Sequence, residues 1–83
     1  MKSYGFTVTE KMISNVQKQL RAYESFKHSD VVKLLIDVGV PEKLDKKLVA
    51  YSIASKILKT LKKEELIIKH IDSTGGYWVW KKD

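Results

Sequence analysis

Apolar residues recur three or four positions apart near the start of the chain, which is the spacing of one face of a helix. The recurring residues are Val8, Met12, Ile13, Val16 and Leu20. Thr7 and Glu10 match a capping box, in which each side chain accepts an amide N–H at the helix start. The pattern predicts a first helix over about 8–23.

A short connector follows, with Phe26 as its expected buried anchor. The next apolar face consists of Val31, Val32, Leu35, Ile36 and Val38. Ser29 suits the N-cap of this segment, and Gly39 suits the left-handed residue that ends a helix. We therefore expect a second helix over about 30–38, and an extended link at Pro41.

A third helix is expected to begin between Pro41 and Lys46 and to run to about Glu64. Its core stripe is Ala50, Ala54, Ile57, Leu58 and Leu61. Its opposite side carries Ser52, Ser55, Lys56, Lys59 and Lys63. That side is polar, basic and free of acidic residues.

After Glu65 the pattern changes from helix to strand. Residues 66–71 and 77–80 are rich in β-branched and aromatic side chains, and the turn formers of 72–76 lie between them. This arrangement predicts a β-hairpin followed by a tail at 81–83. Gly75 and Gly76 belong to the turn, because no helix follows them to form a phosphate-binding loop.

The net charge of +6 is confined to one segment. Residues 43–63 hold seven lysines and one acid, whereas the rest of the chain has nine basic and nine acidic residues. A local excess of this kind favours a polyanionic partner. The alternative is a solvated helix face on which lysine serves solubility.

The composition excludes several classes of protein. With 83 residues, 43% of them hydrophobic, the chain is expected to form one domain over 1–83, with 1–6 as an N-terminal arm. It has no cysteine, and its two histidines, His28 and His70, have no acidic cluster at metal-ligand spacing around them. We expect no metal, no cofactor, no small-molecule substrate and no enzymatic activity. Without a membrane span or signal peptide, the expected location is the cytoplasm, associated with the nucleoid if the source is prokaryotic or viral.

Three short helices closed by a β-hairpin resemble the winged-helix family of helix-turn-helix domains. The most specific stretch is 53–67, where a small core residue is followed by Ser-Lys, Leu-x-x-Leu, an acidic pair and Leu-Ile opening a strand. The chain departs from the family at Glu65, where a helix-ending glycine is usual. The resemblance implies an α+β, mostly α fold, a third helix that enters the DNA major groove, and the hairpin as wing.

The expected DNA-binding residues lie on the third helix and the wing. They are Lys47, Tyr51, Ser52, Ser55, Lys56, Lys59, Lys63, Lys69, Ser73 and Thr74. The lysines suit phosphates better than bases, because guanine recognition usually uses arginine. Alternatively, Ser52 and Ser55 are exposed serines with no role in binding, and Tyr51 packs at the edge of the core and does not touch DNA.

The predicted hairpin is apolar on both faces, so something should cover the second face. The residues expected to contact a partner or a second subunit are Ile67, Ile71, Tyr77, Trp78 and Trp80. Three alternatives for what packs on this face are left open: the N-terminal Tyr4 and Phe6, a second copy of the chain, or another protein.

The leading hypothesis is a sequence-specific or semi-specific protein that binds double-stranded DNA, a small transcriptional regulator that acts as a homodimer. The alternative is a winged-helix adaptor or inhibitor that binds protein through its aromatic wing, since a fold does not fix a function. RNA binding through the hairpin aromatics ranks last.

Overall fold

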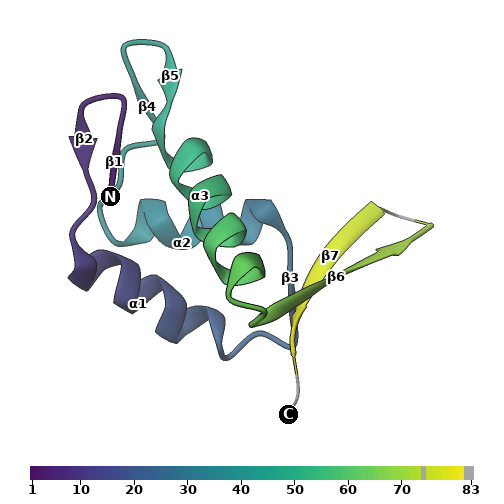
Figure 1. Ribbon diagram of the computed structural model, residues 1–83. Coiled ribbons are helices and arrows are strands. Elements are labelled where there is room, and N and C mark those ends of the chain that lie inside the picture. Colours follow the sequence, from purple (N-terminus) through teal and green to yellow (C-terminus); the bar gives the residue numbers. More distant parts are fainter. Residues whose placement is uncertain (74, 82–83) are drawn as a thin grey trace.

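Three helices form most of the molecule, and short antiparallel strands form the rest (Figure 1). The computed structural model describes residues 1–73 and 75–81. Within them the helices are α1 (Glu10–Leu20), α2 (His28–Asp37) and α3 (Val49–Lys63). The strands are β1 (Lys2–Ser3), β2 (Phe6–Thr7), β3 (Ser25–Phe26), β4 (Lys43–Leu44), β5 (Lys47–Leu48), β6 (Ile67–Asp72) and β7 (Gly75–Trp80). The α+β prediction of three helices and a small antiparallel sheet is confirmed. The expected wing residue Thr74 and positions 82–83 of the tail lie outside the described residues.

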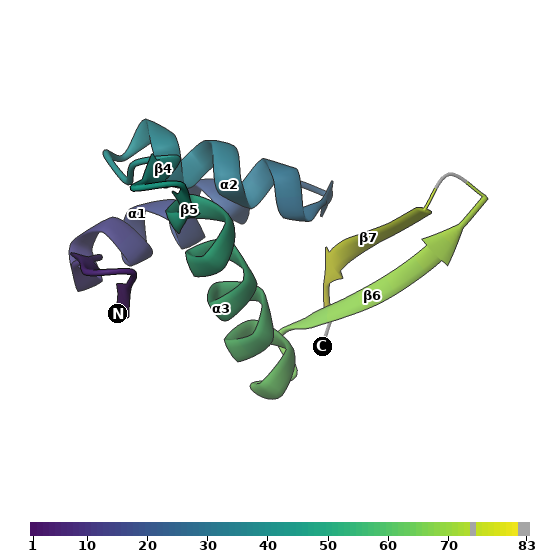
Figure 2. The same cartoon turned by 90° about the horizontal axis from the view of Figure 1, so that it is seen from above.

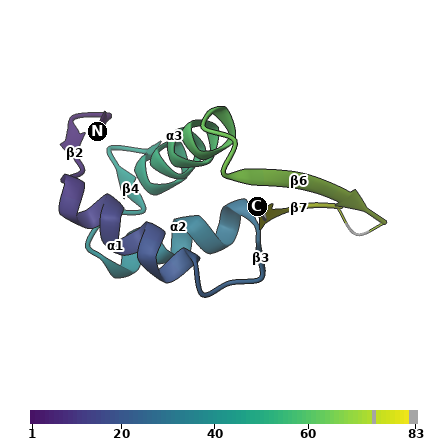
Figure 3. The same ribbon diagram turned by 60° about the horizontal axis from the view of Figure 1, so that its bottom comes forward.

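The C-terminal hairpin is joined to the helices by β3, a strand that the sequence did not predict. The sheet order is β3-β7-β6. Phe26 pairs with Trp78 in β7 and is only 1% exposed, which confirms it as a buried anchor. From this base, β6 and β7 extend well beyond the helices (Figures 2 and 3).

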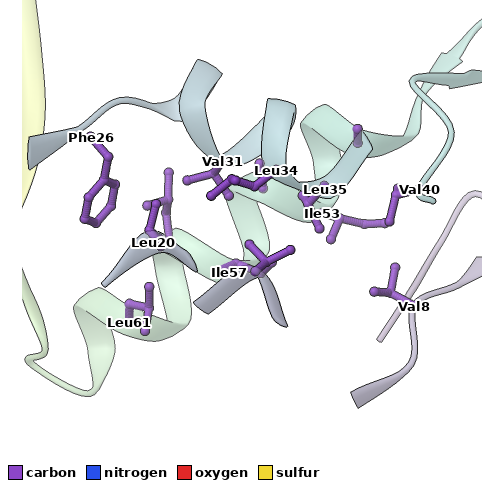
Figure 4. Packing of buried hydrophobic residues seen from close by; sticks show 14 of the residues in the cluster. Val8, Leu20, Phe26, Val31, Leu34, Leu35, Val40, Ile53, Ile57 and Leu61 are labelled. Carbon is purple, nitrogen blue, oxygen red and sulfur yellow. The ribbon is translucent and has the colours of Figure 1, made fainter. Parts of the chain in front are cut away.

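The core lies where α2 packs against both α1 and α3. Figure 4 shows that it is built from aliphatic side chains of all three helices, with Phe26 at one end and Val8 at the other. The whole predicted stripe of α3 is buried, as are Val49 and Ile53. Alanines at 50 and 54 carry little side-chain bulk at this interface, which suits close approach of the helices.

Two helix starts differ from the prediction. Thr9, not Thr7, caps α1, and its hydroxyl accepts the Met12 amide N–H at 3.2 Å. Thr7 is instead the partner of Lys2 in the β1–β2 hairpin. At α2 the helix begins at His28, before the expected cap Ser29, and the Asp30 carboxylate accepts the Lys27 amide N–H at 2.8 Å.

The third helix begins later than expected, at Val49. Residues 43–48 form the β4–β5 hairpin, in which Asp45 and Lys46 make the turn with φ of 49° and 67°. Two successive positive φ values are the geometry of a tight hairpin turn that matches strand twist. The connection between α2 and α3 is therefore residues 38–48, not the three- or four-residue turn of a helix-turn-helix.

The end of α3 shows why the missing glycine at position 65 is tolerated. Glu65 itself adopts the left-handed conformation, with φ of 60°. The Leu66 amide then donates to the Leu61 carbonyl at 3.0 Å, the bond that closes a Schellman motif. The helix is thus sharply terminated without glycine.

The N-terminal arm is also a hairpin, and it does not cover the wing. Figure 1 shows β1–β2 beside the first half of α3, at the end of the molecule away from β6–β7. Contacts between β1 and α3 hold it there. The expectation that Tyr4 and Phe6 fold over the second face of the C-terminal hairpin is wrong.

Candidate nucleic-acid interface

The outward side of α3 is a contiguous polar and basic surface, which we name the lysine face. It consists of Tyr51, Ser52, Ser55, Lys56, Lys59, Thr60, Lys62 and Lys63. All of these are exposed except Ser52, which is half-buried. The face holds four lysines and no acidic residue, and Lys59 lies at its centre by helical position. The prediction that this side of α3 turns outward is confirmed.

One flank of the lysine face is bordered by β1. The Ser3 hydroxyl donates to Ser52 Oγ at 2.8 Å, and the Lys56 ammonium donates to the Lys2 carbonyl at 2.9 Å. Ser3 is itself 5% exposed, so this contact is part of the packing. Lys56 is therefore held in place, and Ser52 is less accessible than the sequence suggested.

The other flank is bordered by His28 at the start of α2. Its Nε2 lies 2.9 Å from Ser55 Oγ, and the Ser55 hydroxyl donates to the Tyr51 carbonyl at 3.2 Å. The His28 and Tyr51 rings are in contact, with centroids 4.1 Å apart. Tyr51 remains 56% exposed, so it does not lie at the edge of the core.

Burial lowers the pKa of His28 below 6.5, because the imidazolium loses hydration, and a hydrogen bond with the Tyr51 backbone offsets part of the shift. The unfolded chain then takes up the proton more readily than the folded one. This contribution to stability is present above pH 6.5 and is lost as the pH falls through the lowered pKa.

We expect His28→Gln to reduce the fall in stability between pH 7.5 and 5.5, measured as the free energy of unfolding in urea. Thr60→Ala is the control, since it changes an exposed side chain of α3 on the side away from His28 and should keep the wild-type pH dependence. An unchanged pH dependence in His28→Gln would contradict the assignment.

The hairpin β6–β7 carries the predicted wing residues. Lys69 is paired with Trp78, and its ammonium lies 5.6 Å from the centre of the Trp78 ring. Ser73 is exposed at the tip. Lys69 and Trp78 face the same hollow as the last turns of α3, so the structure brings the wing and the lysine face together.

Lys47 was expected on the third helix, but it lies in β5. Its ammonium is 5.8 Å from the centre of the Tyr4 ring, which links the β4–β5 hairpin to the N-terminal hairpin. Lys43 and Lys46 are exposed on the same hairpin and extend the basic surface beyond the start of α3. Lys43, Lys46, Lys62 and His28 were not among the predicted site residues. Lys62 could have been found from its three-residue spacing to Lys59.

Several residues expected to contact a partner are used inside the chain. Ile67 is 4% exposed and belongs to the core, and Trp78 and Trp80 are half-buried against it. The Trp80 indole N–H donates to the Leu20 carbonyl at 3.1 Å. Ile71 is 81% exposed near the hairpin tip, and Tyr77 is half-buried on the opposite face.

On the outer face of the hairpin, opposite to Trp78 and Trp80, two apolar side chains are exposed to solvent. Leu66 and Ile68 are 37% and 44% exposed there, and Val79 and Tyr77 lie on the same side. A hollow of about 700 Å³ adjoins this face, lined in part by Arg21, Tyr23 and Ile68.

Residues 1–73 and 75–81 hold no cluster of three or more histidine, cysteine or acidic side chains that could bind a metal ion. No helix in that part of the chain has the length and apolarity to cross a membrane.

No protein-family model, curated protein or solved structure matches this chain.

Proposed function

We propose that the chain is a winged-helix protein that binds double-stranded DNA and acts as a small transcriptional regulator. The observation that carries this proposal is the lysine face, with four lysines and no acid on the exposed side of one helix. The B-DNA major groove is about 12 Å wide and admits one helix.

The charges suit the backbone of DNA better than its bases. Lysine ammonium groups act as point charges toward phosphates and release counterions on binding. Lys62 and Lys63 also lie in the last turn of α3, where the negative end of the helix dipole favours cations. Recognition of sequence would fall to Tyr51 and Ser55, whose side chains are held by contacts with His28.

The arrangement of elements supports the winged-helix assignment in outline. Three helices, a small antiparallel sheet and a protruding hairpin are consistent with that layout. The β4–β5 hairpin between α2 and α3 departs from a simple helix-turn-helix. The wing of this proposal is β6–β7, with Lys69 and Ser73 on it.

A second candidate function is protein binding on the outer face of β6–β7. It is favoured by the exposed Leu66 and Ile68, which have the half-buried Val79 and Tyr77 beside them, and the proposed homodimer would use the same face. Ile68→Asp would then weaken association in sedimentation while leaving DNA binding intact.

A mobility-shift competition tests the proposed function. Labelled duplex DNA is incubated with the protein, and unlabelled duplex, single-stranded DNA and RNA compete at equal nucleotide concentration. We expect the duplex to compete best. Better competition by single strands or RNA would overturn the assignment to double-stranded DNA.

A further inference from the structure

A basic hollow lies between α3, the inner face of the wing and the start of α2. Its volume is about 330 Å³. The lining residues are His28, Ser55, Leu58, Lys59, Lys62, Lys69 and Trp78. Three of the seven carry positive charge and none is acidic. Like charges gathered around one space repel each other, and an anion there removes the repulsion.

The Lys69 side chain is held across the two strands of the wing. It is directly opposite Trp78, and its ammonium lies over that ring at 5.6 Å. The Lys69 side chain can pass over residue 76 because that residue is glycine. A Cβ at this position would lie 2.9 Å from Lys69 Cε. The contact with the Trp78 ring favours this position of an exposed side chain before any ligand arrives.

The two lysines of α3 face Lys69 from the other wall of the hollow. Lys59 and Lys62 are three residues apart, so they lie on neighbouring positions of the helix surface. Ser55 and His28 add polar groups at the same end and are joined to each other at 2.9 Å. The hollow thus presents ammonium groups from two elements, α3 and β6, to one small volume.

We propose that this hollow holds one phosphodiester group of the DNA backbone, at the side of the groove that α3 enters. The inference rests on the proposed function and adds a defined phosphate position to it. A phosphodiester fits because the cations are lysines, which bind phosphate as point charges, and because the hollow continues directly into the lysine face. Lys62 and Lys69 then act on the same phosphate and not on two.

The test compares Lys62→Gln, Lys69→Gln and the double variant by fluorescence anisotropy of a labelled duplex at several salt concentrations. Each single variant is expected to weaken binding about tenfold. The double variant should lose clearly less than the product of the two, with the salt slope reduced by about one. Lys11→Gln/Lys18→Gln, on the exposed side of α1, is the matched control and should bind like the wild type.

Gly76→Ala provides a variant with no change in charge. The added methyl group should displace Lys69 and weaken binding, by less than Lys69→Gln because the displaced side chain keeps its charge. In the Lys69→Gln background the same alanine should have no further effect on affinity, which separates loss of the cation from damage to the hairpin. A further loss there would contradict the role of Gly76 in positioning Lys69.

The outcomes separate this inference from the proposed function. If the wild type does not bind duplex DNA, both fail. If it binds, and Lys62→Gln/Lys69→Gln binds equally well with the same salt slope, the phosphate position alone is overturned. Fully additive losses, with the slope reduced by two, would place the lysines on separate phosphates and would also overturn it.

Discussion

The double charge reversal Lys59→Glu/Lys63→Glu is expected to reduce affinity for duplex DNA at least about 100-fold, because hydrogen bonds to charged groups contribute about 1.5–3 kcal/mol each. Both side chains are exposed on the lysine face, so their replacement removes phosphate contacts and adds repulsion. The fold should persist, because neither residue belongs to the core. Anisotropy with a labelled duplex measures the affinity, and circular dichroism checks the helix content.

The matched control is Lys11→Glu/Lys18→Glu. It makes the same change in net charge on the exposed side of α1, and Lys18 lies in the last turn of its helix as Lys63 does in α3. A modest loss of affinity from net charge alone is expected there. Equal losses in the two double variants would show that total charge, and not the lysine face, accounts for binding.

Phe26→Ala is expected to destabilise the protein by about 3–5 kcal/mol, the usual cost of removing a buried aromatic ring. Phe26 is 1% exposed, and its ring centroid lies 5.6 Å from that of Trp80. It belongs to the core and to the strand that ties the wing to the helices. Because small domains are stable by only about 5–15 kcal/mol, the urea midpoint should fall sharply.

Ile71→Ala is the control within the same sheet. Its side chain is 81% exposed, so the expected change in stability is below about 0.5 kcal/mol. If Phe26→Ala changed stability as little as Ile71→Ala, the wing would not be anchored through β3 as the structure shows.

The helices and their buried faces could be predicted from the sequence because their signal is local. The stripe from Ala50 to Leu61 follows the helical period, and every member of it is buried. The side facing away from a buried stripe must be exposed, so the lysine face followed from the same pattern. Helix ends were less accurate, since either Thr7 or Thr9 could have capped α1.

The short hairpins were not predicted because each turn contains only one of the usual turn residues, Gly5 or Asp45. In these tight turns Tyr4, Asp45 and Lys46 adopt positive φ although they are not glycines. Such conformations cost energy in isolation and are held by surrounding contacts, such as that of Lys47 with Tyr4. No local feature of the sequence indicates those contacts.

The sequence also could not show which face of the β6–β7 hairpin packs against the core. Both faces of β6 and β7 are apolar, so alternation alone does not tell which one meets the core. The choice is made by β3, which pairs with β7 and brings Phe26 next to Trp80. Trp78 and Trp80 therefore turn inward, and the exposed apolar side chains of the hairpin are Leu66, Ile68 and, near the tip, Ile71.

The salt dependence of duplex binding tests the central claim most directly. If the lysine face and the wing together contact about four to six phosphates, log K against log salt should have a slope of about −4 to −5. A slope near this value, made shallower by about two in Lys59→Glu/Lys63→Glu, is the predicted result. The absence of duplex binding at low salt, or a slope near zero, would contradict the assignment of α3 as the DNA-binding helix.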